Sequence, residues 1–104
     1  MLSFIRKLFQ SAPEPDFRQM VSKGAQIIDV RSPAEFSGGH IKGSKNIPLQ
    51  SLGSGLSGLR KDKPVITCCA SGMRSASAKS VLLSAGFSEV YNGGGWTRLQ
   101  SKLS

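Results

Sequence analysis

The residues best suited to chemistry lie together in the segment CCASGMRS, residues 68–75. An apolar run at residues 64–68, which we interpret as a buried strand, precedes it, and an alanine- and leucine-rich helix is predicted at residues 75–86. A loop from a parallel strand into a helix is a common ligand site, since the helix start offers free N–H groups and a positive dipole end. A thiol among these donors ionises readily, because they favour the thiolate. The segment therefore predicts a nucleophilic cysteine in an anion-binding loop.

The two cysteines of the chain are adjacent and have different predicted roles. Cys68 ends the predicted strand and is expected to be a small buried hydrophobe, whereas Cys69 follows where the chain turns outward. We therefore predict that Cys69 is the catalytic nucleophile and that it is accessible, with Arg74 adding a positive charge nearby. The alternative is an ordinary strand–turn–helix with an inert thiol. Adjacent cysteines and a single histidine do not suggest a structural disulfide or a metal site.

Several polar and aromatic residues outside this loop have structural interpretations. We expect Asp29 and Arg31, at the end of a strand, to form a supporting pair that ties loops together rather than to act directly in catalysis. For His40, in a loop after two glycines, a local role is favoured over that of a base or ligand. Tyr91 and Trp96 are expected to pack in the core or at the rim of the site.

The elements that would position these residues alternate along the chain. Strands are predicted at residues 25–30, 44–48, 64–68 and 90–91, and helices after the capping residue Asp16, in a capping box from Ser32 to Glu35, and from Trp96 onward. Leucines at positions 52, 56 and 59 suggest a weak helix in a glycine-rich stretch. This alternation predicts an α/β domain whose mostly parallel sheet is covered on both faces.

The first fourteen residues are interpreted as an N-terminal extension, and residues 15–104 as the domain. The extension places four apolar side chains on one side of a possible helix, but Arg6 and Lys7 break the apolar run that a secretory signal needs. A short packed helix or a partly disordered terminus is favoured. A helix that docks on a membrane surface or a partner is the alternative.

The net charge of +8 comes from 14 Lys and Arg against 6 Asp and Glu. The basic residues are scattered and not interleaved with aromatic ones, so we do not expect nucleic-acid binding. We expect the charge to favour small anionic substrates and an acidic protein partner. No apolar run approaches the ~20 residues that cross a bilayer, so a soluble protein without membrane partners is expected. The unpaired cysteines suggest the reducing cytoplasm.

Three segments together resemble the rhodanese-like single-domain sulfurtransferases: IIDVRSPAEFSGGHIKGSKNIPL at residues 27–49, TCCASGMRSASA at 67–78 and GFSEVYNGGGW at 86–96. The resemblance implies a rhodanese-like fold, with a central, mostly parallel sheet of about five strands flanked by helices on both faces. It also implies a six-residue loop, Cys69 to Arg74, whose backbone amides surround the sulfur. The residues assigned to substrate binding are Ala70, Ser71, Gly72, Met73, Arg74 and Ser75.

The same resemblance implies a ping-pong reaction without a cofactor. The Cys69 thiolate would take a sulfane sulfur from thiosulfate or a persulfide donor, then pass it to cyanide or a thiol. Many relatives place a cation directly after the cysteine, where this chain has Ala70. We therefore expect weak binding of thiosulfate and better use of a persulfide donor.

Three alternative functions are compatible with parts of this pattern. The fold also serves as a non-catalytic interaction module, although such modules usually lack the cysteine. A redox role would use Cys68 to resolve an oxidised Cys69. Dual-specificity phosphatases have a similar loop that is one residue longer, and Cys68 does stand six residues before Arg74. Their glycine, however, follows the nucleophile by three positions, which fits Cys69 and Gly72 instead.

Overall fold

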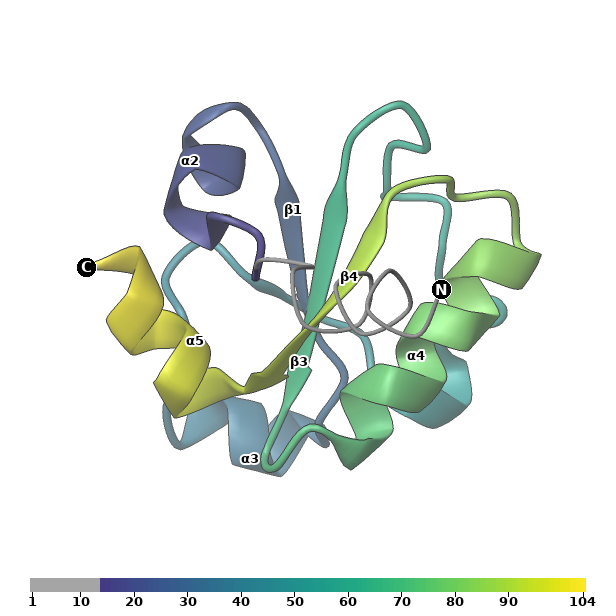
Figure 1. Ribbon diagram of the computed structural model, residues 1–104. Coiled ribbons are helices and arrows are strands. Elements are labelled where there is room, and N and C mark those ends of the chain that lie inside the picture. Colours follow the sequence, from purple (N-terminus) through teal and green to yellow (C-terminus); the bar gives the residue numbers. More distant parts are fainter. Residues whose placement is uncertain (1–13) are drawn as a thin grey trace, which may run out of the picture.

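The computed structural model describes residues 14–104, in which helices and strands alternate along the chain (Figure 1). The elements, in chain order, are α2 (Phe17–Ser22), β1 (Gln26–Asp29), α3 (Pro33–Ser37), β2 (Lys45–Asn46), the 3-10 helix η1 (Leu49–Ser51), β3 (Val65–Cys69), α4 (Met73–Ser84), β4 (Val90–Gly95) and α5 (Trp96–Leu103).

The strands form one parallel sheet in the order β2-β1-β3-β4. The predicted α/β class and parallel sheet are confirmed, but the expected number of about five strands is wrong, since residues 14–104 contain four. The described chain before β1 forms a helix, in which the Asp16 side chain accepts a hydrogen bond from the Gln19 N–H. The segment between η1 and β3 runs in turns and also adds no strand.

Helices cover both faces of the sheet, as expected (Figure 1). Alternate strand residues point to opposite faces, so neighbours such as Ile27 and Ile28 enter different cores. On one face, Ile28 packs in a cluster with Leu82 of α4. On the other, Ile27 packs with Phe17 of α2 and Leu99 of α5. The sheet is therefore buried between two helical layers.

The weak helix predicted for residues 51–59 is wrong. The chain makes the short η1 and then a series of turns, although Leu52 and Leu59 are buried in the α4-side core. The glycines of this stretch disfavour a continuous helix, while the leucines are still available to anchor the turns.

Strand β4 continues to Gly95, beyond the predicted residues 90–91. The strand continues through a run of glycines because a side chain would not fit at Gly93. A Cβ at Gly93 would lie 2.8 Å from the carbonyl oxygen of Thr67 and 2.9 Å from side-chain atoms of Ile66 and Leu99. Glycine at this position therefore allows β4 and α5 to approach β3 closely.

The capping box predicted at Ser32 and Glu35 is confirmed: the Ser32 hydroxyl accepts from the Glu35 N–H, and the Glu35 carboxylate accepts from the Ser32 N–H. The predicted N-terminal extension lies almost entirely outside the described residues, so its interpretation stays a prediction. From residue 14 onward, no helix is both long and apolar enough to span a bilayer.

Candidate functional site

Cys69 is the last residue of β3 and lies where the chain turns into α4. Gly72 caps this helix with a φ of 105°, a left-handed conformation that side chains other than glycine rarely adopt. A Cβ there would also lie 3.4 Å from the Cα of Gly94 in β4. This left-handed turn starts α4 at Met73, two residues before the predicted helix start, and curls the loop around Cys69.

The Cys69 sulfur lies among hydrogen-bond donors from the start of α4. It accepts a hydrogen bond from the Gly72 N–H at 2.9 Å and one from the Ser75 N–H at 3.4 Å. Its own S–H donates to the Ser75 hydroxyl oxygen at 3.5 Å. The two N–H donors stabilise a negatively charged sulfur at a helix N-terminus.

Burial opposes ionisation of Cys69, but hydrogen bonds outweigh it. They come from the Ser75 hydroxyl and from the N–H groups of Ser75, Gly72 and Ser71, and together they lower the pKa of Cys69 below the ordinary thiol value. The loop can therefore hold a thiolate at a lower pH than an exposed cysteine would.

The expectation that Cys69 is accessible is wrong for this structure, because only 1% of the residue is exposed. Its side chain belongs to the apolar cluster on the α4 side of the sheet, which also contains Val30 and Ala78. The rim of the loop is open by contrast: Ala70 and Ser71 are exposed, and Met73 is 80% exposed. A second sulfur atom bonded to Cys69 would have to extend toward this rim.

Arg74 forms an ion pair with Glu35 of α3. Nη1 donates to Oε1 at 2.8 Å, and Nη2 donates to Oε2 at 3.0 Å. Hydrogen bonds from the Arg74 guanidinium and then from the Ser32 N–H lower the pKa of Glu35 to about 2. The positive charge of Arg74, which was expected to act on Cys69, is thus paired with the Glu35 carboxylate. The sequence predicted Glu35 only as part of a capping box.

Asp29 and Arg31 form a buried ion pair at the end of β1. Arg31 Nη2 lies 2.7 Å from Asp29 Oδ2, and Nε donates to both carboxylate oxygens. The remaining Arg31 donors reach the carbonyl oxygens of Glu35 and Gly39. The hydrogen bonds to Asp29 raise the pKa of Arg31, although burial opposes this. The pair links β1 to the middle of α3 and to Gly39, just beyond that helix. Helix α3 also carries Glu35, the partner of Arg74.

The other residues singled out from the sequence lie outside the hydrogen bonds of Cys69. Trp96 is half-buried, and the Arg31 guanidinium lies over its ring, with Cζ of Arg31 4.7 Å from the ring centroid. The exposed His40 stacks on Phe36, and its Nδ1 lies 2.7 Å from the Phe36 carbonyl oxygen. Tyr91 packs against the core on the α2 and α5 side.

Cys68 faces away from the loop. It is fully buried on the α2 and α5 side of the sheet, whereas Cys69 belongs to the cluster on the α4 side. Burial, followed by the charge of Asp29, raises the pKa of Cys68 to about 12. The nucleophile position required by the phosphatase interpretation is therefore occupied by a shielded thiol that points to the opposite core.

Asn92 contacts the loop and was missed in the sequence analysis. Its Oδ1 accepts from the Ser75 hydroxyl at 2.6 Å and from the Gly94 N–H at 2.9 Å. A signal was present, because asparagine is unfavourable in strands and Asn92 follows the predicted strand at residues 90–91. In the sheet, β4 lies next to the strand that ends in Cys69.

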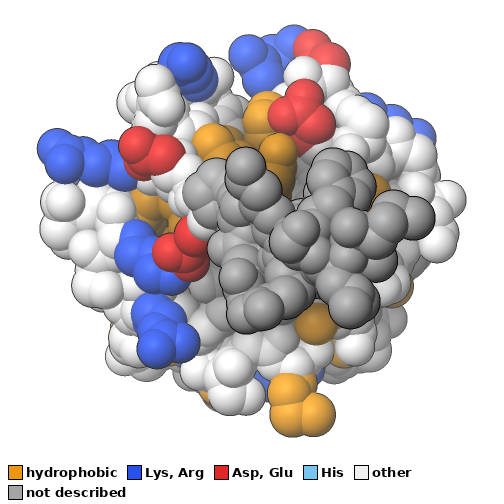
Figure 2. Space-filling view, in the orientation of Figure 1, with side chains coloured by type: hydrophobic (Ala, Val, Ile, Leu, Met, Phe, Trp, Pro, Cys, Tyr) orange, Lys and Arg blue, Asp and Glu red, His pale blue; other side chains and the backbone are white. Residues whose placement is uncertain are grey.

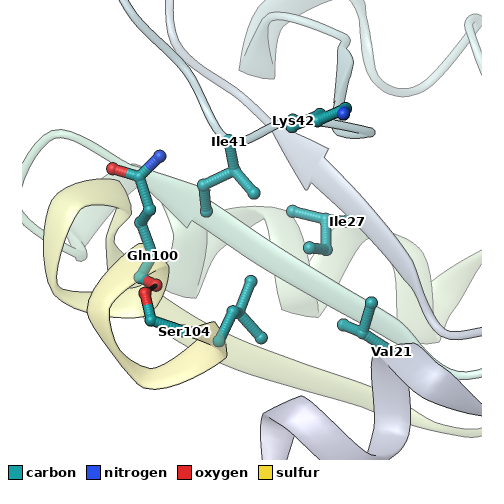
Figure 3. A pocket seen from close by; sticks show the side chains of 7 residues that line it. Val21, Ile27, Ile41, Lys42, Gln100 and Ser104 are labelled. Atoms are coloured by element: carbon teal, nitrogen blue, oxygen red, sulfur yellow. Dashed lines mark hydrogen bonds between the residues drawn. The ribbon is translucent and has the colours of Figure 1, made fainter.

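Other surface features lie apart from the loop. Residues 14–104 contain no group of three or more His, Cys, Asp or Glu side chains able to hold a metal ion. On the face of the molecule drawn in Figure 2, Lys and Arg side chains are spread among Asp and Glu side chains. A pocket of about 250 Å³ lies on the α2 and α5 side, opposite the Cys69 cluster (Figure 3). Its lining residues are Val21, Ile27, Ile41, Lys42, Gln100, Leu103 and Ser104.

Comparison with known proteins matches residues 14–102 to the rhodanese-like domain family. The uncharacterized protein YqhL of Bacillus subtilis is 40% identical over 99 residues, which are 94% of this chain and 78% of that protein. The thiosulfate sulfurtransferase GlpE of Pseudomonas aeruginosa is 36% identical over 84 residues, or 81% of this chain and 76% of GlpE.

Solved structures agree with the sequence matches. A rhodanese with anions from E. coli aligns with a TM-score of 0.68 and 31% identity, covering 72% of this chain and 91% of that one. The human single-domain sulfurtransferase TSTD1 aligns with a TM-score of 0.75 and 26% identity, covering 86% and 94% of the two chains.

Proposed function

Since this chain belongs to the rhodanese-like domain family, we propose that it is a sulfurtransferase that carries sulfane sulfur as a persulfide on Cys69. The observation that supports this most directly is the hydrogen bonding of the Cys69 sulfur by the Gly72 and Ser75 N–H groups. These donors match an anionic sulfur, whether a thiolate or the inner sulfur of a persulfide.

In the first half-reaction, the Cys69 thiolate attacks the outer sulfur of a donor. With thiosulfate, a bond forms between the Cys69 sulfur and the sulfane sulfur, the S–S bond of thiosulfate breaks, and sulfite leaves with the electron pair. The lowered pKa of Cys69 favours the thiolate form that attacks. A persulfide donor reacts in the same way, with a thiolate as the leaving group.

In the second half-reaction, a nucleophilic acceptor removes the outer sulfur. Cyanide carbon or a thiolate bonds to it, the S–S bond to Cys69 breaks, and the electron pair returns to the Cys69 sulfur. The Gly72 and Ser75 donors stabilise this leaving thiolate just as they stabilise the attacking one. Cys69 therefore returns to its starting state without net oxidation.

The charge and the thiols suggest the setting of this reaction. The excess of positive charge supports anionic donors and an acidic protein partner. Both cysteines are free thiols, which fits a reducing compartment such as the cytoplasm.

Sulfur transfer from thiosulfate or a low-molecular-weight persulfide to cyanide tests the proposal. We expect thiocyanate to form with the unmodified protein and a mass increase of one sulfur atom on Cys69 when the donor is supplied alone. The Cys69→Ser variant should give neither. A folded protein that acquires no persulfide from either donor would instead support a non-catalytic interaction module.

A further inference from the structure

The Ser75 hydroxyl has one proton and three neighbouring acceptors. Its oxygen lies 2.6 Å from Asn92 Oδ1, 2.9 Å from the Gly72 carbonyl oxygen and 3.5 Å from the Cys69 sulfur. Only one of these acceptors can take the proton in a direct hydrogen bond at a time.

The contacts of Asn92 determine where that proton lies. Its amide oxygen is oriented toward the Gly94 N–H, at 2.9 Å, because a flipped amide would place two donors against each other. Oδ1 is therefore an acceptor toward Ser75 as well, and two oxygens 2.6 Å apart need a proton between them. Ser75 supplies that proton, which leaves an oxygen lone pair of Ser75 facing the S–H of Cys69.

We propose that Asn92 is a positioning residue that holds the Ser75 hydroxyl proton away from the Cys69 sulfur and so favours the thiol over the thiolate. When Cys69 loses its proton to solvent, the Ser75 hydroxyl can donate to the thiolate only by leaving Asn92 Oδ1. Donation to an anionic sulfur is the stronger of the two hydrogen bonds, so the exchange takes place, but its gain is reduced by the bond that breaks.

The charged groups near the Cys69 loop come in pairs. Arg74 of α4 is paired with Glu35 of α3, and Asp29 and Arg31 at the end of β1 pair with each other. On β3, the neighbouring thiol is Cys68, whose raised pKa keeps it neutral. From Asn92 to its end, β4 contributes only Asn92 and glycines. The hydrogen bonds from Asn92 through Ser75 to Cys69 therefore link uncharged groups until the sulfur ionises.

The test is the pH profile of Cys69 alkylation by iodoacetamide in the full chain, with Cys69→Ser as the blank. Asn92→Leu fills the space of the amide and provides no acceptor, so its midpoint should fall by about half to one pH unit, the size expected for the neutral Ser75–Asn92 hydrogen bond that no longer has to break. In a Ser75→Ala background the same substitution should leave the midpoint unchanged. Gln100→Leu, an exposed change on α5, is the matched control.

A midpoint that stays constant or rises in Asn92→Leu would overturn the proposal, since a purely structural asparagine would loosen the loop donors when removed. A fall that persists in the Ser75→Ala background would overturn it too. If Asn92→Leu does not fold, Asn92→Asp serves instead. Its alkylation midpoint should rise, and this rise should be smaller in the Ser75→Ala background than in the background that keeps Ser75. Equal rises in both backgrounds would contradict the proposal. The inference rests on the Cys69 thiolate of the proposed function, but alkylation reports on that thiol whether or not sulfur transfer occurs.

Discussion

Arg74, the last residue of the loop that begins at Cys69, donates from both terminal nitrogens to the carboxylate of Glu35, at 2.8 and 3.0 Å. The guanidinium thereby connects α4 to α3 across the rim of the site. Its positive charge is already matched before a donor arrives. Arg74 thus contributes to the position of the helices more than to the net charge available for an anionic substrate.

Removing the carboxylate that pairs with Arg74 should lower the KM for thiosulfate. In Glu35→Gln, the Arg74 guanidinium is free to pair with a dianionic donor, and we expect the KM for thiosulfate to fall by about threefold to tenfold. The KM for an uncharged persulfide donor should change little. Steady-state kinetics with both donors measure this. Asp62→Asn is the matched control, since it breaks the exposed Arg60–Asp62 ion pair away from the site. A thiosulfate KM equal in both variants would contradict the expectation.

Acid should weaken the same ion pair within a defined pH window. Interaction with Arg74 and Ser32 lowers the pKa of Glu35 from 4.5 to about 2, so the folded state binds this proton less readily than the unfolded state. The stabilisation from Glu35 is therefore complete above about pH 4.5 and is lost as the pH falls through about 2. Urea unfolding at several pH values should find the unmodified protein more stable than Glu35→Gln at pH 6. That difference should shrink toward pH 2; a constant difference would contradict the assignment.

Substitution of the two cysteines should separate chemistry from stability. Cys69→Ser should lose sulfur transfer and remain folded, because the serine hydroxyl is a small replacement that can still accept from the Gly72 and Ser75 N–H groups. Cys68→Ser places a hydroxyl in the apolar core between the sheet, α2 and α5, and should lower the free energy of unfolding by about 1–3 kcal/mol. Its activity should persist under conditions where it is folded. Equal loss of activity in both variants at matched stability would overturn the assignment of Cys69.

Titration of the thiols should reveal two very different groups. Cys69 should be alkylated with a midpoint below the ~8.5 of a free cysteine, because loop donors lower its pKa despite burial. Cys68 should stay unreactive in the folded protein up to strongly alkaline pH, since burial raises its pKa to about 12. Mass spectrometry of the alkylated protein counts the modified thiols, and denatured protein provides the control in which both react. A midpoint for Cys69 equal to that of the denatured protein would show that the loop does not stabilise the thiolate.

Donor preference should follow the side chains of the loop rim. Ala70 and Met73 bring no charge, and Arg74 is paired, so thiosulfate should bind weakly compared with a persulfide. Ala70→Arg adds an exposed cation at the rim and should lower the thiosulfate KM by about tenfold. Ala70→Gln, similar in length but uncharged, is the control. A micromolar thiosulfate KM that Ala70→Arg does not change would contradict this prediction.

The sequence predicted the parts of the fold and site that depend on local pattern. The helix caps at Asp16 and Ser32, the burial of Cys68 and the helix after the loop all follow from spacing and residue type. The turns after η1 were mistaken for a helix because leucine spacing alone does not distinguish a helix from turns that bury the same side chains. The extent of β4 depended on a close approach to Thr67, which no local pattern reveals.

Contacts between distant segments were the least predictable part of the site. Glu35 and Arg74 are 39 residues apart, and Ser75 and Asn92 are 17 apart, so their pairing depends on how α3, α4 and β4 meet around the loop. The burial of Cys69 has the same origin. Its position at the end of a strand suggested an outward turn, but Cys69 is still part of β3 and its side chain lies with Val30 and Ala78 in the α4-side core.

The opposite orientation of Cys68 and Cys69 has a consequence for how long sulfur can be stored. In a pair of neighbouring thiols on one surface, the second thiolate would attack a persulfide on the first, release sulfide and leave a disulfide. Here the sheet separates the two side chains, and the raised pKa of Cys68 keeps it protonated. A persulfide on Cys69 is thus protected from its nearest neighbour in the sequence. In the proposed reaction, its lifetime would then depend on the acceptors that reach the loop rim.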